Sequence, residues 1–230
     1  VIRRFEKDPG VTGFVVTGYG NRAFCAGADI GRFVDMLGDA PAAAQYARDC
    51  SRLLVHLDRM KKPVVAALNG MALGGGLELA MRCHAIVAVK HAWLQLPEVT
   101  LGIVPGIGAM VVPYRRWPHA ADTFNAMLRQ AGRLKAARAR ELADDYASLV
   151  GMAAAQVRQL AGRLAPIGDA PVEVRIEPAE ARSTSGQLLS RECIAIMEEA
   201  IRAAAAAPSF AAALETGYLA FGRSACTEAA

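Results

Sequence analysis

Hydrophobic residues in this chain form short unbroken apolar runs and longer amphipathic segments. The runs at 11–17, 63–68 and 85–89 predict strands, and the run 63–68 does not alternate, which is typical of a strand buried on both faces. Apolar periodicity over 42–60 predicts an amphipathic helix, and a second helix starts near Leu77 after a run of glycines. This order of strand, glycine turn, helix and strand predicts an α/β fold with a largely parallel sheet.

The second half of the chain is mostly helical in pattern. Glycine and proline recur over 92–114, so we expect an ordered loop with short elements there, and the polar stretch 166–187 predicts a linker or insertion. Further helices are predicted over 120–128, 136–143, 153–164, 190–207 and 208–221. We therefore expect a core over 1–165, a linker or insertion over 166–189, and a helical region over 190–230.

Composition narrows the class of protein. The chain has 230 residues, of which 53% are hydrophobic and 21% charged, as in ordinary globular proteins. No apolar stretch approaches the roughly 18 to 20 residues of a membrane span, and the first eight residues are too charged for a secretory signal. We expect a cytoplasmic protein that does not enter a membrane.

Metal-binding and disulfide patterns are lacking in the sequence. The five cysteines are scattered and include no C-x-x-C pair, so they predict reduced thiols. The four histidines have no metal-ligand spacing. We expect neither a disulfide framework nor a metal site.

The formal net charge of +4 is spread along the chain. A mildly basic surface suits a polyanionic ligand such as a nucleotide, but few aromatic residues accompany the basic ones, so we do not expect nucleic acid as a partner. The basic residues between Arg133 and Arg140 recur at near-helical spacing. They favour a solvated helix face over an anion site.

Two glycine motifs could contact a ligand. Gly18-x-Gly20-x-x-Ala23 follows a strand as in a dinucleotide fingerprint, but another loop follows it where a helix should begin, so we reject that interpretation. Three glycines at 74–76 directly precede a helix, which indicates close backbone approach. Free amides at a helix start can hold an oxyanion, although a tight turn with close helix packing is the alternative.

Two glutamates are candidates for proton transfer. Glu78 lies in the first turn of the helix after the glycines, where the helix dipole alone would favour a carboxylate. Glu98 stands among apolar residues, where an ionised group is costly unless it is paired or used. Acid and base catalysis is one interpretation of the pair, and a buried ion pair is the other.

Three blocks of sequence, at 23–30, 63–80 and 97–108, together resemble the enoyl-CoA hydratase/isomerase (crotonase) family. They read AFCAGADI, PVVAALNGMALGGGLELA and PEVTLGIVPGIG, in the family's order. The resemblance covers roughly residues 8 to 112. It implies a spiral of repeated ββα units with a C-terminal helical region used in oligomers, either homotrimers or dimers of trimers.

The resemblance also implies roles for single residues. The backbone N–H groups of Ala28 and Gly75 would hold the thioester oxyanion, Glu78 would orient and deprotonate the attacking water, and Glu98 would exchange the proton at C2. Arg22 and Ile30, with Ala26 and Arg32, would lie near the adenine and phosphates of coenzyme A. The other residues implied in binding the CoA thioester are Gly27, Asp29, Gly74 and Gly106.

Both glutamates together favour hydration of a 2-enoyl-CoA, as in the β-oxidation of fatty acids, with no cofactor because coenzyme A is part of the substrate. Isomerisation or hydrolytic ring opening would use the same enolate. A non-catalytic crotonase-fold protein that binds RNA is the alternative from another class. Relative to the family both ends look truncated, so we expect a piece of a longer protein, fused to or associated with another β-oxidation activity.

Overall fold

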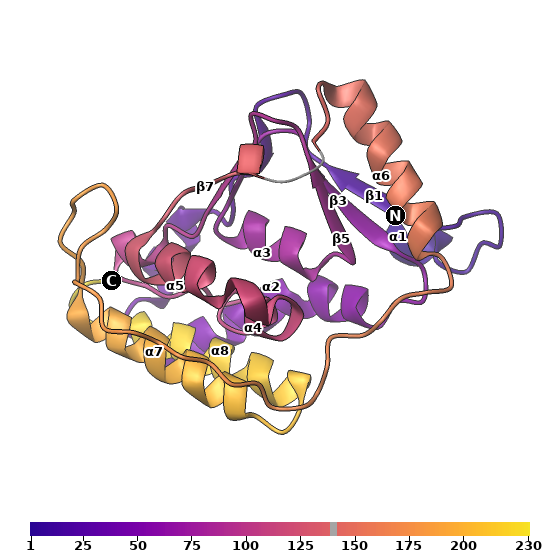
Figure 1. Ribbon diagram of the computed structural model, residues 1–230. Helices are drawn as coiled ribbons and strands as arrows, with labels where there is room; N and C mark the ends of the chain where they lie inside the picture. The colour runs from indigo at the N-terminus through magenta and orange to yellow at the C-terminus, as the bar shows by residue number, and fades with distance from the viewer. Residues whose placement is uncertain (139–141) are drawn as a thin grey trace.

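The computed structural model describes residues 1–138 and 142–230. Within these residues, seven short strands form two sheets, one with the order β1-β3-β5 (Figure 1) and one with the order β2-β4-β6-β7. These seven strands pair in parallel, except that β6 and β7 are antiparallel. The strands are β1 (Phe14–Thr17), β2 (Ala23–Cys25), β3 (Val64–Leu68), β4 (Met71–Leu73), β5 (Ala85–Ala88), β6 (Trp93–Gln95) and β7 (Leu134–Lys135).

The strands and helices repeat as ββα units. Each of three consecutive units gives its first strand to one sheet and its second strand to the other. The first unit ends in α2 (Ala40–Asp58) and the second in α3 (Gly75–Arg82). This arrangement confirms the expected α/β fold of the crotonase type with its largely parallel sheets.

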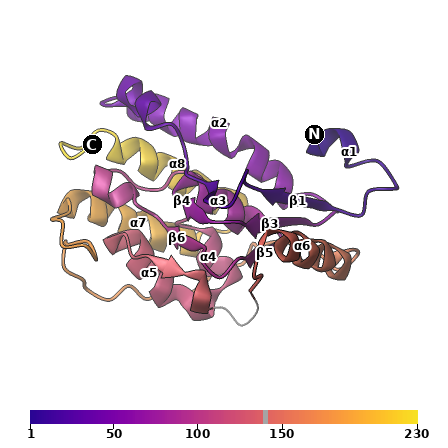
Figure 2. The same cartoon turned by 90° about the horizontal axis from the view of Figure 1, so that it is seen from above.

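The apolar run at 63–68 forms the central strand of its sheet. All five residues of β3 are buried, because β1 and β5 flank it and helices cover its faces. Figure 2 shows α2 on one side of this strand and α6 (Tyr146–Leu160) on the other. The lack of alternation in the sequence thus reflects burial on both faces.

Helices near the C-terminus cover the part of the core that lies beside α2. α7 (Arg191–Ala206) and α8 (Phe210–Ser224) pack together, and α8 lies along α2. The side chains of Ser190 and Ser209 cap the N-termini of α7 and α8, where each hydroxyl oxygen accepts a hydrogen bond from a backbone amide of the first turn. The remaining helical elements are α1 (Ile2–Phe5), η1 (Ile30–Met36), η2 (Glu98–Leu101), α4 (Val112–Arg116), η3 (Pro118–Ala120), α5 (Ala121–Gln130) and η4 (Ala136–Arg138).

Two helix predictions need correction. The helix expected over 136–143 is a 3₁₀ turn at 136–138, and Ala143 instead forms a parallel bridge to Val89, while residues 139–141 lie outside the described residues. The helix expected over 153–164 begins earlier, at Tyr146, because Asp145 and Ser148 form a capping box. Capping thus set the start of α6, which apolar periodicity alone had placed too late.

Residues 166–189 contain no helix or strand, yet they are bonded to the helices beside them. Asn125 Nδ2 donates to the carbonyl oxygen of Arg175, and Arg129 Nη1 donates to that of Glu177. The amide of Val172 donates to the carbonyl oxygen of Ala205. The division of the chain at 165 and 190 stays a prediction.

Among the described residues, no helix combines the length and apolar character needed to cross a bilayer. Within the same residues, no group of three or more His, Cys, Asp or Glu side chains is arranged to hold a metal ion.

The contact between α3 and β2 can be tested with a matched pair of substitutions. A Cβ atom on Gly76 would lie 2.4 Å from the carbonyl oxygen of Cys25, so Gly76→Ala should lower the free energy of unfolding by about 1–3 kcal/mol. A Cβ atom on the exposed helical Gly151 would meet nothing within 4 Å, so Gly151→Ala should raise it by about 0.5–1 kcal/mol. Urea denaturation measures both, and equal effects of the two substitutions would contradict the tight contact.

Candidate active site

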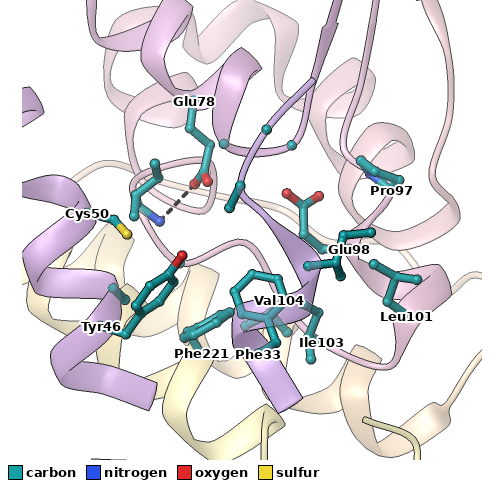
Figure 3. A pocket seen from close by; sticks show the side chains of 18 of the residues that line it. Phe33, Tyr46, Cys50, Glu78, Pro97, Glu98, Leu101, Ile103, Val104 and Phe221 are labelled. Atoms are coloured by element: carbon teal, nitrogen blue, oxygen red, sulfur yellow. Dashed lines mark hydrogen bonds between the residues drawn. The ribbon is translucent and has the colours of Figure 1, made fainter. Parts of the chain in front are cut away.

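A mainly apolar cavity of about 120 Å³ lies where the loop after β2, the start of α3 and the segment 97–107 meet. α2 and α8 close it from the other side, and Figure 3 shows the side chains of Glu78 and Glu98 at its wall. Both glutamates therefore line one cavity, although they come from different elements.

Two glycine-containing loops bring backbone amides to the cavity. Gly27 has a φ of +99°, and a Cβ atom there would lie 3.0 Å from the carbonyl oxygen of Leu73 and 3.5 Å from the amide nitrogen of Gly75. A Cβ atom on Gly75 would lie 3.8 Å from the amide nitrogen of Ala28. The two loops can approach this closely only because their residues are so small.

The amides of Ala28 and Gly75 are free to bind a ligand. Neither donates a hydrogen bond to an acceptor within residues 1–138 and 142–230, and both residues line the cavity. Gly75 is also the first residue of α3, where the helix dipole places partial positive charge. Such a pair of donors can stabilise an oxygen that gains negative charge during a reaction.

Glu78 is buried and hydrogen-bonded in the first turn of α3. Its residue is 2% exposed, and its Oε1 accepts hydrogen bonds from the amides of Ile107 (3.0 Å, Figure 3) and Ala109 (2.8 Å). Burial raises the pKa of Glu78 to about 7, although the two amides and the charge of Arg82 oppose the rise. This carboxyl group can therefore lose its proton near neutral pH.

Glu98 is the first residue of η2 and lies against the glycine run. A Cβ atom on Gly74 would lie 2.7 Å from Glu98 Oε1, and Oε2 is shielded from solvent with no hydrogen-bond partner in the described part of the chain. Burial, and after it the charge of Glu78, raises the pKa of Glu98 to about 8. Because the two carboxyl groups interact, they titrate as a pair in which Glu98 holds its proton to higher pH.

The far wall of the cavity comes from residues that the sequence did not point to. The ring of Phe33 contacts Tyr46 and Phe221 edge-on, with centroid separations of 5.8 and 5.7 Å. Tyr46 and Cys50 come from α2, and burial raises the pKa of Tyr46 to about 12. Phe33 and Tyr46 lie on the consecutive elements η1 and α2, whereas Phe221 comes from the distant α8, so no local motif could have revealed this wall.

Most of the residues expected at the site do meet at the cavity. Arg22 does not line it but is exposed, and Asp29 uses its Oδ1 to accept a hydrogen bond from the amide of Gly31 at the start of η1. The expected residues that line the cavity are Ala26, Gly27, Ala28, Ile30, Gly74, Gly75, Glu78, Glu98 and Gly106. The catalytic and binding roles assigned to all these residues stay predictions.

Comparison with known proteins identifies the family. The family model for enoyl-CoA hydratase/isomerase matches residues 1–143, which is more than half of the chain. The chain belongs to the enoyl-CoA hydratase/isomerase family. The residues that line the cavity all lie in the part of the chain that matches the family model, except Phe221 on α8.

Individual relatives agree with this assignment. A probable enoyl-CoA hydratase of Bacillus subtilis (strain 168) is 40% identical over 122 residues, 53% of this chain and 45% of that protein. A carnitinyl-CoA dehydratase of Proteus mirabilis (strain HI4320) is 35% identical over 179 residues, 70% of this chain and 67% of that protein. A solved enoyl-CoA hydratase/isomerase structure from Mycobacterium paratuberculosis aligns over 100% of this chain and 81% of its own, with a TM-score of 0.63 and 26% identity. The matched part of the chain thus spans less than half of the Bacillus relative.

The pKa of Glu98 predicts how the stability of this family member changes with pH. The unfolded chain releases the Glu98 proton near the ordinary value of 4.5, whereas the folded chain keeps it up to about 8. The free energy of unfolding should therefore fall as the pH rises through this window, and Glu98→Gln should reduce the fall.

Denaturation at a series of pH values measures this dependence, with Glu180→Gln at an exposed position as the matched control. We expect Glu180→Gln to keep the wild-type slope. If Glu98→Gln also keeps the wild-type slope, Glu98 is not the buried acid described here.

Proposed function

We propose that this family member is an enoyl-CoA hydratase, which adds water across the 2,3 double bond of an enoyl-CoA thioester. The observation that carries the proposal is that two carboxyl groups with raised pKa values line one mainly apolar cavity together with two amides that have no acceptor among the described residues. Hydration needs this combination, because it requires a base, an acid and a site for the enolate oxygen.

The amides of Ala28 and Gly75 would bind the thioester oxygen. As water adds to C3, electrons move from the double bond onto this oxygen, and the enolate forms. A donor already in place stabilises that charge without reorganisation, and losing one such donor typically costs about 3 to 4 kcal/mol of transition-state stabilisation. The start of α3 adds the positive end of its dipole at Gly75.

The two glutamates would divide the proton transfers. Glu78, whose Oε1 accepts two amide hydrogen bonds that stabilise its carboxylate, takes a proton from water while the water oxygen bonds to C3. Glu98, with a pKa of about 8, is protonated at neutral pH and gives its proton to C2 as the enolate collapses. The product is a 3-hydroxyacyl-CoA, and proton exchange then restores the two carboxyl groups.

The names of the relatives support water addition or removal on a CoA thioester, since one is a probable enoyl-CoA hydratase and another a carnitinyl-CoA dehydratase. We propose that the nucleotide end of coenzyme A runs outside the cavity past Ile30, within reach of Arg22. No further cofactor enters this scheme. A trimer or dimer of trimers, a fused or associated β-oxidation activity, and a place in fatty acid metabolism in the cytoplasm stay predictions.

The direct test measures the loss of enoyl thioester absorbance when the full-length protein meets crotonyl-CoA. We expect turnover and a 3-hydroxyacyl-CoA product. Isomerase or ring-opening activity would instead appear as a shifted double bond or an opened ring. No turnover of crotonyl-CoA or of any longer or cyclic enoyl-CoA would refute the hydratase proposal.

Glu98→Gln should lower kcat by about 10²–10⁴-fold with little change in KM, because it removes the proton donor for C2 but leaves the two amides in place. It should also stop exchange of the C2 proton of a saturated acyl-CoA with solvent deuterium, measured by NMR. Glu180→Gln serves as the control and should leave both activities unchanged. Continued C2 exchange in Glu98→Gln would show that another group carries this proton.

A further inference from the structure

We propose that Arg82 is a positioning residue for Glu78, which it holds in place through the backbone of Ile107. The inference rests on the proposed function, since it assigns a partner to the base of that reaction. Arg82 does not line the cavity and would not touch substrate. Its effect on catalysis would be transmitted by the segment 106–109.

The contacts of Ile107 connect the two side chains. Its amide donates to Glu78 Oε1 at 3.0 Å, and its carbonyl oxygen accepts from Arg82 Nη1 at 2.8 Å. Glu78 and Arg82 lie four residues apart on α3, so both bonds tie the same helix to the same loop residue. Displacement of the Ile107 backbone would therefore change the position or the hydrogen bonding of the Glu78 carboxyl group.

The loop is shaped around the guanidinium group. Gly108 has a φ of +140°, and a Cβ atom there would lie 3.1 Å from Arg82 Nη1 and 3.3 Å from Val112 Cγ2. Ala109, the next residue, supplies the second amide to Glu78. A side chain at 108 would push the loop away from Arg82. Glycine at this position therefore allows the hydrogen bond between Arg82 and Ile107.

The buried charge of Arg82 is balanced at its other end. Its side chain has 0% exposure, and its Nε donates to Asp58 Oδ1 at 2.9 Å while Nη2 pairs with Oδ2. Asp58 on α2 thus neutralises the guanidinium, which leaves Nη1 for the carbonyl oxygen of Ile107 and a long contact of 3.5 Å to Ser51 Oγ. The hydrogen bond from Nη1 to Ile107 is not needed for the ion pair with Asp58, so it indicates a separate role for Arg82.

The charge of Arg82 acts on Glu78 against the effect of burial, because the positive guanidinium lowers the pKa of the Glu78 carboxyl group. The negative charge of Glu78 in turn raises the pKa of Glu98. The other charged groups near Arg82 are Asp58 on α2 and Arg116 on α4, and Arg116 instead donates to the carbonyl oxygen of Cys83.

Two variants of the full-length protein separate this role from plain packing. Arg82→Met combined with Asp58→Asn removes both charges and the bond to Ile107, whereas Asp58→Asn alone leaves the charge of Arg82 uncompensated. Both break the ion pair and should lower the Tm. They should move the apparent pKa of the acidic limb of kcat/KM in opposite directions, upward in the double variant and downward in the single one.

We expect the double variant to lower kcat about 10-fold to 100-fold with KM nearly unchanged, because the base is misplaced while the binding loops remain. Arg116→Met is the matched control, since it removes a neighbouring half-buried cation without touching Ile107, and it should leave the pH profile in place. The inference is wrong if the apparent pKa of the acidic limb of kcat/KM is unchanged in both variants that carry Asp58→Asn, and if the loss of activity merely parallels the loss of Tm.

Two further measurements keep the result decisive. The ¹³C signal of labelled Glu78, assigned by its loss in Glu78→Gln, should give a higher pKa in the double variant than in the wild type. This measurement does not require turnover, so it tests the inference separately from the hydratase proposal. If the double variant does not fold, Arg82→Lys keeps the charge but loses the forked geometry. Wild-type kcat in Arg82→Lys would then refute the positioning role.

Discussion

The close approach of two backbone segments, the loop after β2 and the start of α3, is the constraint on which the rest of the site depends. At Gly76 a single methyl group would lie 2.4 Å from the carbonyl oxygen of Cys25, so no larger residue fits without displacement. The same approach brings the amides of Ala28 and Gly75 to one cavity. It also fixes the direction of α3 and therefore the place of Glu78.

Burial of two carboxyl groups beside each other is costly, and the fold compensates for only part of that cost. Glu78 receives two amide hydrogen bonds, whereas Glu98 keeps one oxygen without a partner in the described structure. Burial raises the pKa of both carboxyl groups; the amide hydrogen bonds oppose this rise at Glu78, whereas the charge of Glu78 adds to it at Glu98. Different environments for two similar groups are what allow one to act as a base while the other remains an acid.

Local sequence predicted much of the fold, because strands and helices leave their own periodicity. The buried strand at 63–68, the glycine run at 74–76 and the two glutamates were all recognisable, and the family resemblance joined them into one site. The start of α6 was misplaced because a cap made by Asp145 determined it. A cap depends on one or two polar side chains, and the spacing of apolar residues carries no information about them.

The remaining parts of the site depend on tertiary contacts that no local pattern encodes. Phe33 and Phe221 meet edge-on although 188 residues separate them, and Tyr46 reaches the same cavity from α2. Arg82 reads in sequence as an ordinary helix cation, and only the fold reveals it to be fully buried against Asp58 and Ile107. Conversely, Arg22 directly precedes the first matching block, but it is exposed and does not line the cavity.

In the proposed hydration, the two parts of water would add to neighbouring carbons of a CoA thioester bound in one cavity. Crotonyl-CoA can be incubated with the protein in D₂O enriched in ¹⁸O, and the product examined by mass spectrometry and NMR. We expect 3-hydroxybutyryl-CoA with ¹⁸O on C3 and a single deuterium of one configuration on C2. Release of free coenzyme A in place of this product, or a product without label at these two carbons, would contradict the proposed hydration.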